Sequence, residues 1–283
     1  MTKVVAVVLS WNGREDTLAC LRSLEGEDAD VIVVDNASDD GTADAVTGVE
    51  LIRNDRNLGY AGGMNTGIRH ALGRGAGAVL LLNNDVEVEP GSIARLAAHA
   101  AGVGAVCPVV TFADQPDRVW YAGARFDPRR GYNGRHVTET GPGPIETERI
   151  CGAAVLIPRE TLEQVGMFDE DLFAYFEDAD WSLRAREAGL RLLVTPDSRV
   201  RHKVSASTGG EGSPDALYYS ARNLLAVSER HAPLGLFGTW RRRIVALGAL
   251  LAQALGGRGR RARVRGVLDG WRDFRRGRFG PRR

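Results

Sequence analysis

Residues 31–42 read VIVVDNASDDGT, an unbroken apolar run that ends in Asp35 and continues through a polar turn. An apolar run without alternation is typical of a strand that is covered on both faces, as in a parallel sheet. Comparable runs occur at 4–9 and 78–82, and helix-like stretches separate them. This order predicts an α/β protein with a Rossmann-like, doubly wound and mostly parallel sheet that carries helices on both faces.

The same patterns predict the other elements along the chain. We expect strands at 4–9, 31–34, 51–52, 78–82, 153–157 and 192–194, and helices at 15–24, 42–46, 61–72, 159–165, 180–188 and 218–229. The segment 112–148 is rich in Gly, Pro and Arg, and we expect loops and short strands there that shape an acceptor pocket. Residues 205–214 are rich in Ser and Gly and are expected to form a mobile connection.

The charge of the chain is divided unevenly. The total is +1, from 37 Lys and Arg against 36 Asp and Glu, but 14 arginines follow Trp240, where Asp269 and Asp273 are the only acids. Residues 240–283 therefore carry +12 and residues 1–239 carry −11. With 43% hydrophobic and 26% charged residues, the composition is that of a globular protein and excludes a disordered, collagen-like or coiled-coil chain.

The cysteines and the amino terminus predict a cytoplasmic protein. Cys20, Cys107 and Cys151 are odd in number and form no CxxC pair, which disfavours both a disulfide framework and a zinc site. The apolar run at 4–9 follows a single Lys3 and is too short for the core of a signal peptide.

The first candidate ligand-binding residues are those that directly follow a strand, because ligands of doubly wound sheets bind beyond the carboxyl ends of the strands. These residues are Ser10, Asn12, Asp35, Asn36, Asn83, Asn84 and Asp85. Asp35 caps no obvious helix, and we expect its carboxylate to accept a hydrogen bond from a nucleotide base or a ribose. The turn after it has two interpretations, since Ser38 and Asp39 can cap the next helix or leave its amino terminus open to a phosphate.

A glycine-rich segment, NLGYAGGMNTGI, occupies residues 57–68. Gly59 and Gly63 allow the backbone to approach a ligand closely, and Asn57 and Asn65 beside them suit a phosphate or a sugar. The alternative is a plain connection between a strand and a helix. The first strand is followed by LSWNGRE, which lacks the GxGxxG pattern and so disfavours a nicotinamide or flavin enzyme.

The segment VLLLNNDVEVEP at 79–90 places Asp85 at the end of a strongly apolar strand. One carboxylate, substrate phosphate oxygens and water form a usual shell for Mg²⁺ or Mn²⁺. The alternative is that these polar residues only solvate the end of the strand. Further along, His202 is a candidate metal ligand or diphosphate contact, although a single histidine is more often structural.

Acidic side chains gather among aromatic ones in GMFDEDLFAYFEDADWSLRAREAGL at 166–190. Carboxylates among aromatic rings lose solvation, which raises their pKa and makes them better bases near neutral pH. The alternative for Glu177 and Asp178 is a favourable interaction with the amino end of a helix. Downstream, Arg222 can reach an anionic leaving group, or it is a solvated residue beside an aromatic stripe that includes Tyr218.

Together, the motifs resemble the family 2 glycosyltransferases with a GT-A fold, particularly their bacterial rhamnosyltransferase-like branch. The resemblance covers roughly residues 3–230 and lies in the order of VVLSWNG, DNASDDGT, NLGYAGGMN, LLNNDVEV, CGAAVLIPRE, the acidic segment, RVRHKVSAS and YYSARN. It implies that Asp35 contacts the base, that Asp85 holds a divalent cation and that Asp178 is the catalytic base. Asn83 stands where the metal motif of the family often begins with Asp, so Asp85 is the one certain ligand of this motif.

The resemblance also implies the rest of the site. His202 would complete the metal shell, and Trp181 and Arg184 would line the acceptor side together with Cys151, Gly152 and Glu177. The residues expected at the nucleotide-sugar donor are Ser10, Asn12, Asp35, Asn57, Gly59, Gly63, Asn65, Asn83, Asn84 and Arg222.

The chemistry expected of such a site is an inverting sugar transfer. The metal would neutralise the departing diphosphate, Mn²⁺ or Mg²⁺ being the cofactor, and one base would deprotonate an acceptor hydroxyl. dTDP-L-rhamnose is the leading donor, with galactofuranose, glucose and N-acetylhexosamine nucleotides as alternatives. The acceptor is expected to be a cell-envelope or polysaccharide glycan, either free or lipid-linked on a polyprenyl diphosphate, or else a natural product. The competing classes are a nucleotidyltransferase, disfavoured by LSWNGRE, and a non-catalytic nucleotide-sugar-binding module.

The chain is expected to divide into a catalytic domain, 1–232, and a helical basic tail, 233–283. The catalytic domain would bind the donor in its first half, about 1–110, and the acceptor in its second half, 111–232. The apolar stretch 244–257 is too short to span a bilayer and is flanked by arginines, which favours a helix on an anionic membrane surface through residues 241–283. The alternative is a core or homodimer helix, and nucleic acid is disfavoured. We therefore expect a cytoplasmic protein that is peripheral on the inner face of the membrane.

Overall fold

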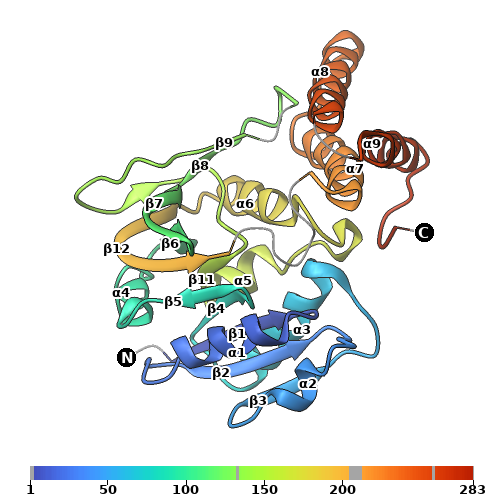
Figure 1. Cartoon of the computed structure of the whole chain (residues 1–283). Coiled ribbons are helices and arrows are strands. Elements are labelled where there is room, and N and C mark those ends of the chain that lie inside the picture. The colour runs from blue at the N-terminus through green and yellow to red at the C-terminus, as the bar shows by residue number, and fades with distance from the viewer. Residues whose placement is uncertain (1–2, 132–133, 204–211, 257–258, 283) are drawn as a thin grey trace.

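The computed structural model describes residues 3–131, 134–203, 212–256 and 259–282, and all structural statements refer to these residues. It contains one large sheet with helices around it, and the helices near the C-terminus form a layer of their own (Figure 1). The strands are β1 (Val4–Ser10), β2 (Asp30–Asp35), β3 (Glu50–Arg53), β4 (Ala78–Asn83), β5 (Val86–Val88), β6 (Ala105–Phe112), β7 (Gln115–Tyr121), β8 (Ala124–Arg125), β9 (Arg135–His136), β10 (Ile145–Glu146), β11 (Ala154–Pro158) and β12 (Leu192–His202). The helices are α1 (Arg14–Ser23), α2 (Thr42–Ala45), α3 (Gly59–Gly73), α4 (Ser92–Ala98), α5 (Arg159–Val165), the 3-10 turn η1 (Glu170–Leu172), α6 (Glu177–Glu187), α7 (Pro214–His231), α8 (Leu236–Leu255) and α9 (Arg260–Arg275).

The order of strands in the main sheet is β10-β12-β6-β11-β4-β1-β2-β3, with β5 paired to β12 and β7 paired to β6. β4, β1, β2 and β3 are parallel, and β11 lies antiparallel between β4 and β6. The chain moves from β1 to β3 on one side of β1 and returns to β4 on the other side. Because such crossovers are right-handed, α1 and α3 cover opposite faces. The reversal also opens a crevice beyond the carboxyl ends of β1 and β4.

Small residues fix the start of α3 against this crevice. α3 packs on β1 and β2, and a side chain at Gly63 would collide with Leu9, while one at Gly67 would collide with Val7. Only glycine therefore lets the helix lie directly on β1. The first turn of α3 is held at the end of β1, where the polar residues after the strands lie.

The helices near the C-terminus pack on one another and on the sheet domain. Leu224, Ala246 and Trp271, one from each of α7, α8 and α9, belong to a hydrophobic cluster that also contains Phe126 and Phe176. The two sides of the predicted boundary between residues 232 and 233 thus share this cluster, and the boundary itself stays a prediction. Within the described residues, no helix is long and apolar enough to cross a bilayer.

The mostly parallel α/β sheet predicted from the sequence is confirmed. The predicted strands and helices of the first 82 residues all occur, with bounds that differ by one or two residues. The apolar helix predicted at 244–257 begins earlier, at Leu236, because the arginines that interrupt the apolar pattern are compatible with a helix. Of the predicted connection at 205–214, residues 205–211 lie outside the described residues.

Candidate active site

A cleft of about 900 Å³ lies between the carboxyl ends of the strands and the helices α6, α7 and α8. It brings together many of the residues selected from the sequence. Those that line it are Asn57, Gly59, Asn83, Asn84, Asp85, Cys151, Gly152, Glu177, Asp178 and His202. The cleft therefore joins the predicted donor residues and the predicted acid pair in one space.

Asp85 and His202 form a buried pair in this cleft. His202 ends β12, where it pairs with Val86 of β5 across antiparallel strands, and this register brings the two side chains together. Nε2 of His202 lies 3.1 Å from Oδ1 of Asp85, and both side chains are almost fully buried. The amide of Lys203 donates a hydrogen bond to the carbonyl of Asp85, at 3.1 Å, which fixes the end of β12 against this turn.

The donor atoms of this pair fit a divalent cation. Oδ1 of Asp85 and Nδ1 of His202 are buried and have no hydrogen-bond partner among the described residues. Such atoms are costly to bury unless something binds them. A carboxylate and an imidazole suit Mn²⁺, and Mg²⁺ prefers oxygen ligands. The described residues contain no group of three or more His, Cys, Asp and Glu side chains that could hold a metal, so phosphate oxygens and water would have to complete the shell.

A network of hydrogen bonds ties the turn after β1 to the turns after β2 and β4. The Asn84 amide donates to the carbonyl of Asn12 at 2.9 Å and to the Thr17 hydroxyl at 3.0 Å, and the Ser10 hydroxyl lies 2.8 Å from that of Thr17. The backbone N–H of Asn12 donates a hydrogen bond to the Ser38 hydroxyl at 2.8 Å. Ser10 and Asn12 therefore hold the turns around the crevice without lining the cleft, whereas Asn84 lines it.

Asn36, which follows Asp35, connects the turn after β2 to α3. Its amide donates to the Asn57 side chain and to the carbonyl of Gly59, both at 3.0 Å, and its oxygen accepts from the amide of Leu58 at 3.0 Å. Asn36 lines the cleft. Asp35 is fully buried beneath the turn, where it accepts a long hydrogen bond of 3.3 Å from the Ser38 amide, and Nε of Arg53 lies 3.8 Å away.

The loop between η1 and α6 has an unusual backbone. Phe173, Tyr175 and Phe176 all have positive φ angles, of 63°, 66° and 72°. Bulky residues rarely adopt this region, and each costs about 1–3 kcal/mol unless the surroundings enforce it. Gly59 makes room for the loop, since a side chain there would collide with Phe173, and the Ala61 amide donates to the Phe173 carbonyl at 3.1 Å.

Arg222 and Asn223 of α7 hold this strained loop from the other side. The amide of Asn223 donates to the carbonyls of Leu172, Ala174 and Tyr175, at 2.8 to 2.9 Å. The Arg222 guanidinium is fully buried and donates to the Leu172 carbonyl at 2.9 Å and to the Gly280 carbonyl at 2.6 Å. Arg222 thus lies outside the lining of the cleft and is not solvated. Its contacts are those of a residue that positions the loop.

The loop delivers Glu177 and Asp178, the first residues of α6, into the cleft. Glu177 is buried, and its Oε2 has no hydrogen-bond partner among the described residues. Burial, with a further contribution from the charge of Asp178, raises the pKa of Glu177 well above the usual range of a glutamic acid. Glu177 is thereby favoured as a neutral acid beside Asp178, whose carboxylate is partly exposed.

Arg149 is the cation closest to this acid pair. Its Nε lies 3.8 Å from Oδ2 of Asp178, and its Nη2 lies 3.0 Å from Nε2 of His136. Burial and the neighbouring Arg149 lower the pKa of His136, which favours a neutral imidazole. The positive charge of Arg149 is thus directed at Asp178, in a part of the cleft that Trp120 and His136 also line.

Other predicted site residues hold the site from outside the cleft. The Asn65 amide donates to the Phe168 carbonyl and to Glu170, both at 2.9 Å. The Trp181 indole donates to the Gly166 carbonyl at 2.9 Å, and the Arg184 guanidinium bonds the carbonyls of residues 165 and 167. Gly63 contacts β1. These residues fix the segment before α6, and none of them is among the lining residues.

Tyr60, Trp120, His136 and Arg149 also line the cleft and were not selected as site residues from the sequence. Tyr60 lies inside the glycine-rich segment 57–68, so a stricter consideration of that motif could have found it. The Tyr60 hydroxyl donates to the carbonyl of Gly152 at 2.5 Å, a contact 92 residues away in the chain. His136 and Arg149 lie in or just after the Gly- and Arg-rich segment 112–148, where no spacing signal marks them.

Comparisons with known proteins agree with this geometry. The model of the family described as "Glycosyl transferase family 2" matches residues 5–166. The chain is 28% identical over 245 residues to the dTDP-rhamnosyl transferase RfbF of Shigella flexneri, which covers 82% of each chain. It is 31% identical over 273 residues to an N-acetylglucosaminyl-diphospho-decaprenol L-rhamnosyltransferase of Mycobacterium tuberculosis, which covers 84% of this chain and 86% of the relative.

A solved structure extends the comparison to the fold. The crystal structure of GalNAc-T7 with UDP, GalNAc and Mn²⁺ superposes with a TM-score of 0.68 at 17% identity, and the match covers 98% of this chain and 56% of that one. The chain belongs to glycosyl transferase family 2 and has the GT-A fold that the sequence predicted. It is a glycosyltransferase of the rhamnosyltransferase-like kind.

Proposed function

We propose that this protein transfers a sugar from a nucleotide diphosphate to an acceptor hydroxyl, with inversion at the anomeric carbon. The observation that carries the proposal is the presence of two chemically different pairs in one cleft. Asp85 and His202 offer buried metal-binding atoms, and Glu177 and Asp178 offer two adjacent carboxyl groups, of which that of Glu177 has a raised pKa. A sugar nucleotide needs both, because its diphosphate must be neutralised as it leaves and its acceptor must lose a proton.

Asp178 is the proposed base. Its carboxylate would remove the proton of the acceptor hydroxyl while the acceptor oxygen forms a bond to the anomeric carbon. The bond from that carbon to the diphosphate oxygen breaks, and the nucleoside diphosphate leaves with the electron pair. One displacement through an oxocarbenium-like transition state inverts the configuration and requires no second carboxylate nucleophile. The guanidinium of Arg149, 3.8 Å from Asp178, places a positive charge beside the proposed base.

Asp85 and His202 would hold Mn²⁺ or Mg²⁺ together with the donor diphosphate. When bound, the cation supplies Lewis-acid neutralisation of the leaving group. The two side chains would orient the diphosphate by fixing the position of the positive charge. The buried Oδ1 of Asp85, which lies against Nε2 of His202 and accepts no hydrogen bond among the described residues, supports this assignment. Asn83 and Asn84 line the same wall of the cleft and are proposed to hydrogen-bond the donor.

The leading donor is dTDP-L-rhamnose, which the relation to the Shigella rhamnosyl transferase supports. The indole of Trp11 is 44% exposed at the mouth of the cleft and offers an apolar face to a base or a sugar. Asp35 remains the proposed contact to the base. Because it is buried beneath its turn, the contact requires the turn at residues 36–40 to move.

The proposed acceptor is a hydroxyl of a cell-envelope glycan carried on a polyprenyl diphosphate. The name of the mycobacterial relative describes such an acceptor. Beyond the acid pair, the cleft continues between α7 and α8, where Leu224, Ala246, Ala249 and Leu250 line it. These apolar walls suit the carrier chain better than a second polar sugar. Such a substrate would also require the enzyme to work at the cytoplasmic face of the membrane.

A donor screen tests the proposal. The protein would be incubated with dTDP-L-rhamnose and with UDP-galactofuranose, UDP-glucose and UDP-N-acetylglucosamine, each with Mn²⁺, Mg²⁺ or a chelator. We expect slow release of nucleoside diphosphate from one donor, which stops with the chelator. Turnover of all donors at one rate, or turnover that is indifferent to metal, would contradict the proposed site.

A further inference from the structure

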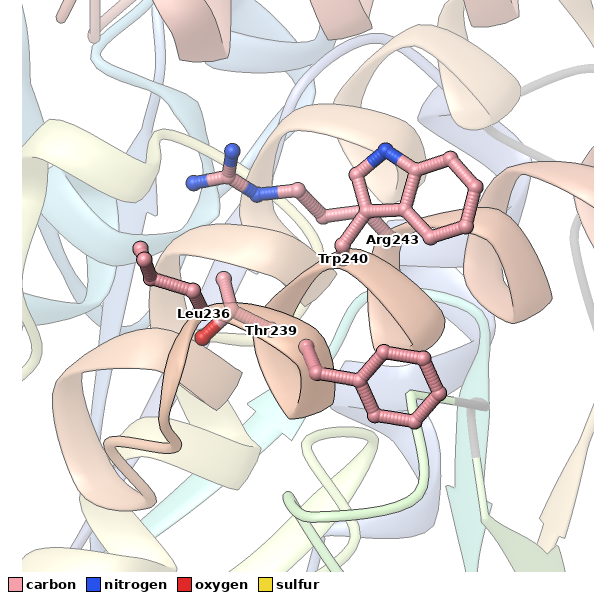
Figure 2. Close-up of a pocket in the computed structure, with 5 residues that line it drawn as sticks. Leu236, Thr239, Trp240 and Arg243 are labelled. Carbon is pink, nitrogen blue, oxygen red and sulfur yellow. The ribbon is translucent and has the colours of Figure 1, made fainter.

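The first half of α8 exposes large apolar side chains. Leu236, Phe237 and Trp240 are 94%, 78% and 64% exposed, and Ile244 and Val245 follow at 50% and 42%. Figure 2 shows Leu236, Thr239, Trp240 and Arg243 around a hollow of about 490 Å³ at the start of this helix. Isolated exposed apolar residues are ordinary, but a contiguous patch of this kind marks an interaction surface.

The patch lies on one side of α8, and another side of α8 packs against the rest of the protein. Phe237, Trp240 and Ile244 recur at intervals of three and four residues and so share one face. Arg242 and Ala246 lie on another face and are buried, and the Arg242 guanidinium bonds the carbonyls of Ser228 and Ala232. The orientation of α8 is therefore set by its buried side. The exposed face, defined as Leu236, Phe237, Trp240 and Ile244, is called the α8 face below.

The segment that carries the α8 face is strongly basic. Residues 240–283 carry a net charge of +12, Arg241 is exposed next to Trp240, and Arg260 and Arg261 are exposed at the start of α9, beyond the far end of α8. Among the described residues, none of these three arginines has an ion-pair partner, whereas Arg243 is paired with Glu229 at 2.7 Å. Exposed apolar side chains that include a tryptophan, in a basic segment with unpaired arginines, have the composition of a helix lying in the interface of an anionic bilayer.

We propose that the α8 face docks the enzyme on an anionic phospholipid surface. The alternative occupant, a second copy of this chain, would form a two-fold interface that brings together two basic segments, each with a net charge of +12 over residues 240–283. Like charges brought together in this way oppose association, whereas lipid phosphates are complementary to them. Charge complementarity therefore selects the lipid surface.

The same helix connects this surface to the cleft. Ala246, Ala249, Leu250 and Gln253 of α8 line the cleft on the side of the helix away from the α8 face. Docking would place α8 between the membrane and the apolar extension of the cleft. A role of this arrangement in reaching a carrier chain, unlike the docking itself, rests on the proposed lipid-linked acceptor.

Vesicle flotation of the full chain tests the docking. The protein would be floated with vesicles of phosphatidylcholine alone or with added phosphatidylglycerol. We expect the wild type to float with the anionic vesicles and to be released by salt. The double variant Phe237→Ser, Trp240→Ser should bind them at least about tenfold more weakly, and Arg241→Gln about fivefold more weakly.

Leu268→Ser is the matched control, because Leu268 is an exposed apolar residue of α9, 46% exposed and outside the α8 face. It should float like the wild type, and all variants should keep the wild-type melting temperature. The proposal is wrong if the double variant floats as well as the wild type. It is also wrong if sedimentation shows a wild-type dimer that the double variant converts to monomer. Flotation requires no donor or acceptor, so a protein that floats but transfers no sugar would contradict only the proposed function.

Discussion

The donor side of the cleft and the acid pair differ in backbone strain and in how completely their polar groups are hydrogen-bonded. On the donor side, the side chains of Asn12, Asn36 and Asn84 make hydrogen bonds of ordinary length to the backbone of neighbouring turns. On the other side, the acid pair follows three aromatic residues with positive φ, and Oε2 of Glu177 has no partner among the described residues. The strained backbone and the raised pKa of Glu177 coincide at the side of the cleft where proton chemistry is expected, which supports the proposed acid pair without reference to any motif.

This difference implies that substitutions can impair donor binding and proton transfer separately. The donor side depends on side chains that lie close to the strand ends. The acid pair depends on support from α7, because Asn223 holds three carbonyls of the preceding loop. Variants of one side should therefore leave the function of the other side intact.

The largest effect is expected from Asp178→Asn. Loss of a general base lowers the rate by about 10²–10⁴-fold, and the isosteric amide keeps the shape of the cleft. Donor binding, measured by calorimetry in the presence of Mn²⁺, should stay within about twofold of the wild type, because Asp178 does not belong to the metal pair. Asp171→Asn, an exposed acid of the preceding turn, is the control and should transfer normally. If Asp178→Asn loses donor binding as well, the two sides are not separate.

Asp85→Ala should instead impair the metal-dependent binding of the donor. Without this carboxylate, the proposed metal site keeps only the neutral or cationic imidazole of His202, and we expect the effect of Mn²⁺ on donor affinity to fall at least about tenfold. Glu87→Gln is the control, since Glu87 lies two residues away and is ion-paired with Arg201 at 3.2 Å. A metal-dependent transfer rate that survives in Asp85→Ala would remove Asp85 from the metal site.

Asn223→Ala tests the remote support of the acid pair. The carbonyls of Leu172, Ala174 and Tyr175 would lose the Asn223 amide as a donor, and Arg222 would still donate to that of Leu172, so the free energy of unfolding should fall by about 1–3 kcal/mol. We expect kcat to fall several-fold while the KM for the donor stays unchanged, because the loop carries the base and not the donor. Ser228→Ala is the control on the same helix, since the buried hydroxyl of Ser228 has no hydrogen-bond partner among the described residues. Equal losses in both variants would mean a general effect on stability.

The smallest effect is expected from Glu177→Gln, which should show in the pH profile. The pKa of Glu177 is raised in the folded protein, so its neutral form is stable at neutral pH and its contribution to stability is lost as the pH rises through that pKa. Glutamine mimics the neutral form. The variant should therefore keep most of its activity at neutral pH and unfold less readily than the wild type at alkaline pH. A variant that is less stable than the wild type at alkaline pH would contradict the neutral form of Glu177.

The fold could be predicted from the sequence because the apolar runs at 4–9, 31–34 and 78–82 each form a fully covered strand. The strand order of the second half could not be predicted. β11 inserts antiparallel between β4 and β6, and this pairing joins segments about 75 residues apart. Local patterns carry no signal for such long-range register.

The candidate site was predictable where a residue lies directly beyond a strand or at a helix start. Asp85 and Asp178 are of this kind and line the cleft. The sequence indicates the chemistry of a side chain but not the direction in which it points. Trp181 and Arg184 were expected on the acceptor side, and they instead donate hydrogen bonds to the carbonyls of residues 165–167. Arg149 could not be found, because only the folded chain places it 3.8 Å from Asp178.

The central claim is that one cleft holds a metal-bound donor at Asp85 and His202 and an independent base at Asp178. Calorimetric titration of dTDP-L-rhamnose, with and without Mn²⁺, into the wild type, His202→Ala and Asp178→Asn tests it most directly. We expect Mn²⁺ to strengthen binding in the wild type and in Asp178→Asn, and to have little effect in His202→Ala. An equal response to Mn²⁺ in all three proteins would contradict the claim.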